Sequence, residues 1–144
     1  MDFFDRLITA LTDTHPIHPM VVHFPIGLTG AALLFILLAL WKNKAFSEGA
    51  AFANIALATV STIVAGITGM YDNQVNYVGD APNAGLKMGL AITLFLVTTV
   101  TAIVRWKKPD VFETSKALYV SAYFVSFALA LVLAFLGGVI LYGF

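Results

Sequence analysis

The sequence predicts an all-α integral membrane protein, a four-helix bundle preceded by a short N-terminal amphipathic helix on the membrane surface. Of its 144 residues, 60% are hydrophobic and only 11% are charged, whereas soluble domains usually contain about 25% charged residues. The apolar residues fall in four stretches without a carboxylate, each long enough to cross about 30 Å of hydrocarbon. We expect a single transmembrane domain over residues 1–144, with spans at approximately 20–41, 50–70, 85–106 and 117–142.

Before the first span, apolar side chains recur at helical spacing and most polar side chains fall between them. This pattern is typical of a short amphipathic helix that lies in the plane of the membrane surface. The apolar face of this predicted helix consists of Phe3, Phe4, Leu7, Ile8 and Leu11.

The positions of the basic residues predict the orientation, because Lys and Arg concentrate in the cytoplasmic connections of membrane proteins. Arg6 and Lys87 fall on one side of the predicted bundle, and the other six basic residues fall on the opposite side. We therefore expect both termini to face outward. The six residues that mark the cytoplasmic side are Lys42, Lys44, Arg105, Lys107, Lys108 and Lys116.

The charge balance and the cysteine count exclude several kinds of function. Eight acidic residues balance eight basic ones, so the chain offers no basic surface for nucleic acid. The chain has no cysteine, which excludes disulfides, thiolate catalysis, iron–sulfur ligation and zinc sites built on sulfur. The residues indicate no reaction, and we expect a non-catalytic protein.

All three histidines lie in one segment, residues 15–27, together with three of the five prolines. Pro25 falls inside the first span, where proline removes a backbone hydrogen bond and should kink or loosen the helix near His23. His18 directly precedes Pro19 and should adopt an extended backbone. Apolar neighbours within the span predict that His23 is the most buried histidine. An ionisable residue in a span is a functional-site hypothesis by default, and the alternative is a structural histidine bonded to a facing carbonyl or threonine.

The connection that follows the second span, residues 71–80, is expected on the same side as the histidines. Asp72 is the partner that we expect beside His18 or His23, where a carboxylate can fix the tautomer, stabilise the cation or relay a proton. Simple termination of the helix is the alternative explanation for this residue. Tyr71 and His15 are further candidate contacts.

Residues 18–26 read HPMVVHFPI and resemble the HPxxVHFPI signature of a group of bacterial membrane proteins, domain of unknown function family 2231. Residues 68–72, Thr-Gly-Met-Tyr-Asp, are similar to the Thr-Gly-x-x-Asp that ends the second helix in that family. Residues 136–138, Leu-Gly-Gly, give weaker support. The resemblance implies a four-span protein of the bacterial inner (cytoplasmic) membrane, with both predicted outward termini in the periplasm.

Members of that family occur joined to Rieske-type or other redox domains, so the resemblance implies a role in membrane electron transport and a possible haem b. Many relatives carry another histidine near the position of Lys87. A bis-histidine haem needs imidazoles on opposite faces of the iron, whereas His18 and His23 would point about 140° apart on one helix. A second subunit could supply the missing ligand, as could Met20, Met70 or Met88.

We therefore expect a non-catalytic membrane subunit or accessory protein of an electron-transport complex. Its outer His/Asp cluster would brace the bundle or line a quinone or lipid pocket. Lys87 would then be a snorkelling anchor or a contact for an anionic lipid or a quinone oxygen. The alternatives are a small b-type haem carrier that uses His23 or His18 and, third, a transporter.

The expected partners are the lipid bilayer and either other membrane redox subunits or a second copy of the chain. The possible cofactors are haem b and a quinone, and neither is fixed by the residues. A non-haem metal held by the histidines and Asp72 lacks a diagnostic spacing, so no metal site is predicted. The candidate cofactor-binding residues are His18, His23 and Asp72, with His15, Lys87 and Tyr71 as further contacts.

Overall fold

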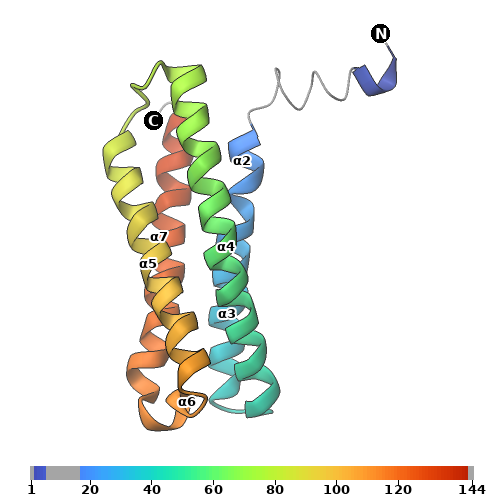
Figure 1. Ribbon diagram of the computed structural model, residues 1–144, viewed down its shortest axis with the longest axis vertical. Coiled ribbons are helices and arrows are strands. Elements are labelled where there is room, and N and C mark those ends of the chain that lie inside the picture. The colour runs from blue at the N-terminus through green and yellow to red at the C-terminus, as the bar shows by residue number, and fades with distance from the viewer. Residues whose placement is uncertain (1, 6–16, 143–144) are drawn as a thin grey trace.

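Four long helices lie side by side in the computed structural model, which describes residues 2–5 and 17–142 (Figure 1). No strand occurs in these two ranges. Each long helix is apolar enough to cross a membrane, which confirms the predicted all-α membrane fold. These candidate spans are Ile17–Ala39, Lys44–Tyr77, Ala84–Lys107 and Lys116–Val139.

The first span is divided into α2 (Ile17–Val21) and α3 (His23–Ala39). The division follows from Pro25, because a proline ring clashes with the carbonyl four residues earlier and proline has no N–H to donate to it. That carbonyl belongs to the last residue of α2. The predicted disturbance of the helix near His23 is therefore present.

The backbone of His18 differs from the predicted extended conformation. His18 lies within α2, and its carbonyl accepts a hydrogen bond from the backbone N–H of Val22 at 3.1 Å. Pro19 occupies the first turn of α2, where its missing N–H needs no partner. The hydrogen bond of this short helical turn outweighs the preference for an extended backbone that a residue before proline has.

Helix α4 (Lys44–Tyr77) is the longest helix and extends beyond the predicted span 50–70 at both ends. Residues 71–77, which were expected in a connection, continue the helix. Asn76 donates a side-chain hydrogen bond to Asp72 one turn earlier, so polar side chains stabilise this part of α4 locally. The helix stops at Val78, whose φ of 51° lies in the left-handed region.

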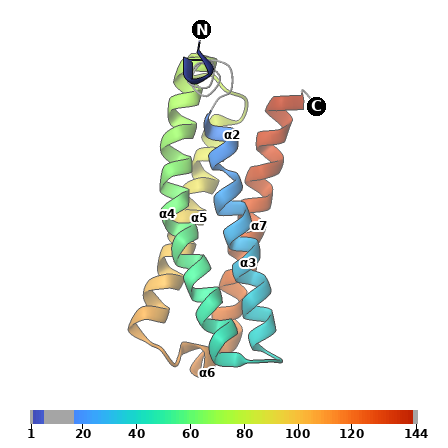
Figure 2. The ribbon, with the colours of Figure 1, turned by 90° about the vertical axis from the view of Figure 1, so that its right-hand side faces the viewer.

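The second half of the chain forms α5 (Ala84–Lys107), the short α6 (Val111–Thr114) and α7 (Lys116–Tyr142). Figure 2 shows α6 at the end of the bundle where α3 passes into α4. We call this the basic end, because it contains the six basic residues of the predicted cytoplasmic side. The opposite end, with α2, the end of α4 and the start of α5, is called the histidine end.

Small side chains allow the helices to approach closely. Helix α3 packs most extensively on α4, where Ala32 and Ala51 are fully buried. Between α3 and α7, Gly30 leaves room for the ring of Phe127, since a Cβ at Gly30 would lie 3.0 Å from that ring. Close packing of small residues is the usual source of helix association in a bilayer.

The predicted surface helix falls mostly on residues outside the described ranges. Residues 3–5 are helical, and the rings of Phe3 and Phe4 make an edge-to-face contact with centroids 5.9 Å apart. The remaining predicted positions, at Leu7, Ile8 and Leu11, lie outside the described residues.

Candidate functional site

His18 connects α2 to α4 at the histidine end. Its Nδ1 lies 3.2 Å from Thr68 Oγ1, and its ring packs on Gly69. A Cβ atom at position 69 would lie only 2.8 Å from His18 Cε1, so the ring occupies the space that any larger residue would fill. The histidine segment and the Thr-Gly segment of the sequence are thereby brought into direct contact.

The hydrogen bonds of Thr68 indicate which nitrogen of His18 carries a proton. The Thr68 hydroxyl donates its only hydrogen to the carbonyls of Val64, at 3.0 Å, and Ala65, at 3.1 Å. With its hydrogen on either carbonyl, the hydroxyl oxygen accepts from His18 Nδ1–H. His18 is partly buried, and its Nδ1 is hydrogen-bonded within the bundle.

Asp72 and Lys87 extend this cluster to α5. Asp72 follows Thr68 by four residues and therefore lies on the same face of α4. Its carboxylate interacts electrostatically with both His18 and Lys87. Both Asp72 and Lys87 are partly buried. The structure thus brings together three of the sequence-predicted candidates, His18, Asp72 and Lys87, from three different helices.

His23 is exposed, and the prediction that it is the most buried histidine is wrong. Five residues separate it from His18, so it points about 140° away on a helix. Because His18 faces α4, His23 faces outward. Its Nδ1 donates to the carbonyl of Pro19 at 2.7 Å, which leaves the lone pair on Nε2 when the ring is neutral.

The other predicted candidates do not join the cluster. Tyr71, Met20, Met70 and Met88 are all exposed, so none of these methionines is directed into the bundle as a second haem ligand. His15 lies outside the described residues. Within the described ranges, no three His, Asp or Glu side chains gather as a metal site would require.

A second polar cluster, which we call the Glu48 network, lies at the basic end and was not predicted. Glu48 of α4 is only 6% exposed and forms an ion pair with Arg105 of α5 through two hydrogen bonds. The second of these joins Arg105 Nη2 and Glu48 Oε2 at 2.7 Å. The hydroxyl of Tyr119 on α7 donates to Glu48 Oε1 at 3.1 Å. The oxygens of Tyr119 and Tyr123 are 2.7 Å apart.

The hydrogen bonds among Tyr123, Tyr119 and Glu48 have one direction, with each donor pointing toward Glu48. An ionised carboxylate only accepts hydrogen bonds, so Tyr119 uses its one hydroxyl proton on Glu48. Tyr123 must then donate to Tyr119. Arg105 donates to both oxygens of the carboxylate and also contacts the ring of Phe52, 5.5 Å from its centroid. The network therefore fixes α4, α5 and α7 to one another with its charges paired.

This direction predicts unequal effects of removing the two tyrosine hydroxyls. Tyr119→Phe leaves the Tyr123 hydroxyl buried without an acceptor and removes one donor from Glu48, so we expect a loss of about 1–3 kcal/mol in unfolding free energy. Tyr123→Phe leaves no unpaired donor and should cost roughly 1 kcal/mol or less. Unfolding of both variants in mixed micelles, followed by circular dichroism, measures the difference. Equal losses would contradict the assigned direction.

Four apolar helices joined by buried polar side chains define a multi-span helical membrane protein. The chain belongs to the family described as predicted membrane protein (DUF2231), which matches residues 14–144. This is the family that the sequence resemblance indicated. Neither a curated protein nor a solved structure was found to match the chain.

Proposed function

We propose that this membrane protein is a non-catalytic subunit or accessory protein of an electron-transport complex, and that its His18 cluster braces the histidine end of the bundle. The contact of His18 with both Thr68 and Gly69 carries the bracing role. The resemblance to proteins joined to redox domains supports the electron-transport role.

An exposed surface beside the His18 cluster supports a role in assembly. Met20 and Phe24 are 54% and 65% exposed, and their spacing of four residues places them on one face of the first span. His23 is exposed between them in the sequence. We infer that this apolar surface contacts another membrane subunit, while the contact of His18 with Thr68 and Gly69 holds α2 in place.

Mild solubilisation of the native membrane tests the assembly role. The protein should elute as part of a larger complex that contains redox subunits, and Met20→Ala with Phe24→Ala should release it as a folded bundle. Leu96→Ala is the matched control, because Leu96 is also exposed but lies on α5. A protein that is always recovered as a free monomer would contradict this function.

A small b-type haem carrier is a second candidate, and one observation favours it. The Pro19 carbonyl fixes His23 through Nδ1, which leaves Nε2 available as an axial ligand, as hydrogen-bonded metal-binding histidines commonly do. A second subunit would have to supply the other ligand. Purified protein should then show a dithionite-reduced haem spectrum that is lost in His23→Ala and kept in Met20→Leu. Colourless, folded protein would exclude this candidate.

We also propose that the histidine end faces the periplasm of a bacterial inner membrane, from the distribution of Lys and Arg. The chain has no cysteine, so single cysteines report the orientation directly. We expect Asp80→Cys to react with a membrane-impermeant maleimide in spheroplasts, and Asp110→Cys to react only after permeabilisation. Both aspartates are exposed. The reverse labelling pattern would overturn this orientation.

A further inference from the structure

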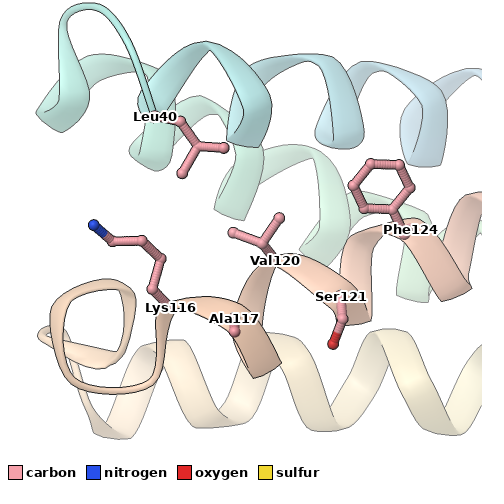
Figure 3. A pocket seen from close by; sticks show the side chains of 6 residues that line it. All are labelled: Leu40, Lys116, Ala117, Val120, Ser121 and Phe124. Atoms are coloured by element: carbon pink, nitrogen blue, oxygen red, sulfur yellow. The ribbon is translucent and has the colours of Figure 1, made fainter.

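A groove opens between α3 and α7 at the basic end, away from the His18 cluster (Figure 3). Its volume is about 450 Å³. Figure 3 shows Leu40 projecting toward it from the α3 side, with Lys116 at one end of the row from α7 and Phe124 at the other. The lining residues are Leu40, Lys116, Ala117, Val120, Ser121 and Phe124.

The polarity of the groove changes along its length. Lys116 is the first residue of α7, and Phe124 lies eight residues later, which is about 12 Å along a helix. Between them the lining is apolar except for Ser121, whose hydroxyl donates to the carbonyl of Leu118 at 2.8 Å. The groove therefore has a positively charged side chain at one end and an apolar lining along the rest of its length.

The position of the groove relative to the helix ends matches the layers of a bilayer. Leu40 caps α3 and Lys116 begins α7, so the charged end lies where these spans leave the hydrocarbon. Trp41 is 85% exposed beside Leu40, as expected of an aromatic residue at headgroup level. Val120 and Phe124 lie deeper, at the level of the acyl chains.

The charges near the groove favour an anion. Lys44 is paired with Glu113, whereas no carboxylate is paired with Lys116 among the described residues. The ammonium of Lys116 lies 5.5 Å from the centroid of the Phe112 ring, which holds it near the groove without neutralising it. Exposed lysines at the same end add to the positive potential, and basic residues near a membrane surface attract anionic lipids.

We propose that this groove binds one anionic phospholipid, with its phosphate on Lys116 and one acyl chain along Val120 and Phe124. The site is independent of the proposed electron-transport function, because it lies at the other end of the bundle and uses none of its residues. A cation at headgroup level joined to an apolar channel is complementary to both parts of such a lipid.

Native mass spectrometry of the full chain in detergent tests the proposal, with phosphatidylglycerol and phosphatidylcholine of identical acyl chains as probes. We expect tighter binding of phosphatidylglycerol, and Lys116→Gln should weaken that binding about fivefold, as for one basic residue at a membrane surface. Lys108→Gln is the matched control, because Lys108 is exposed at the same end but does not line the groove. Its effect should be smaller than that of Lys116→Gln.

A second variant tests the groove itself. Ala117 is exposed, so Ala117→Phe should fill the groove without unfolding the bundle and should weaken phosphatidylglycerol binding although Lys116 is retained. Phe124→Ala, which removes a wall, should also weaken it if Ala117→Phe does not fold. Equal binding of the two lipids, or equal effects of Lys116→Gln and Lys108→Gln, would overturn the proposal. A dimer that Ala117→Phe dissociates, with no specific lipid bound, would assign the groove to a second copy and also overturn it.

Discussion

Replacing Glu48 by alanine should destabilise the bundle by about 3–5 kcal/mol, the usual effect of removing one partner of a buried ion pair. The variant leaves the Arg105 guanidinium without its carboxylate and removes the acceptor for the Tyr119 hydroxyl. The free energy of unfolding in mixed micelles measures this loss. A loss below about 1 kcal/mol would show that the pair behaves as an exposed one.

A double variant separates the cost of an unpaired charge from the contribution of the pair. Glu48→Met combined with Arg105→Met removes both charges, and well-packed apolar residues often replace a buried ion pair without loss. The double variant should therefore be clearly more stable than Glu48→Ala. If it is equally unstable, the Glu48 network contributes through its hydrogen bonds to Tyr119 and not mainly through charge pairing.

The second large effect is expected at the contact between His18 and Gly69. Gly69→Ala places a Cβ 2.8 Å from His18 Cε1, and such overpacking typically costs about 1–3 kcal/mol. Gly66→Ala is the control on the same helix, because a Cβ there meets nothing within 4 Å. It should be neutral or slightly stabilising, since alanine favours a helix over glycine by about 1 kcal/mol.

The origin of the Gly69 effect can be tested in a double-mutant cycle. In a His18→Ala background the imidazole is absent, so Gly69→Ala should no longer cost stability. The coupling energy between the two positions then reports their contact. Independent, additive effects of the two substitutions would contradict the proposed brace.

The sequence predicted the membrane fold well because an apolar stretch needs only composition and length to identify it. It did not predict the rotation of the first span. The spacing places His18 and His23 about 140° apart around the helix. Apolar neighbours in the sequence occur on every side of a residue in a span, so they do not show which of the two histidines faces α4. Gly69 carries that information, because only a residue without a side chain makes room for the ring of His18.

The Glu48 network was missed for a different reason. Glu48 lies just before the predicted span 50–70. The polar residues around it keep this part of α4 out of the apolar stretch that predicts the span. The distribution of Lys and Arg uses Arg105 only to predict orientation, although this residue lies inside the predicted span 85–106. An arginine within a span needs a partner, and Glu48 is one of the few carboxylates at the basic end of the bundle. Their separation by 57 residues hides the pairing from any local pattern.

Helices α4 and α5 are joined by an ion pair at the basic end, where Glu48 meets Arg105. At the histidine end, Asp72 and Lys87 interact electrostatically over a longer distance. The two helices therefore share one fixed point, which lies near the basic end. A displacement imposed at the histidine end would turn the helices about that point and would be smallest beside Glu48.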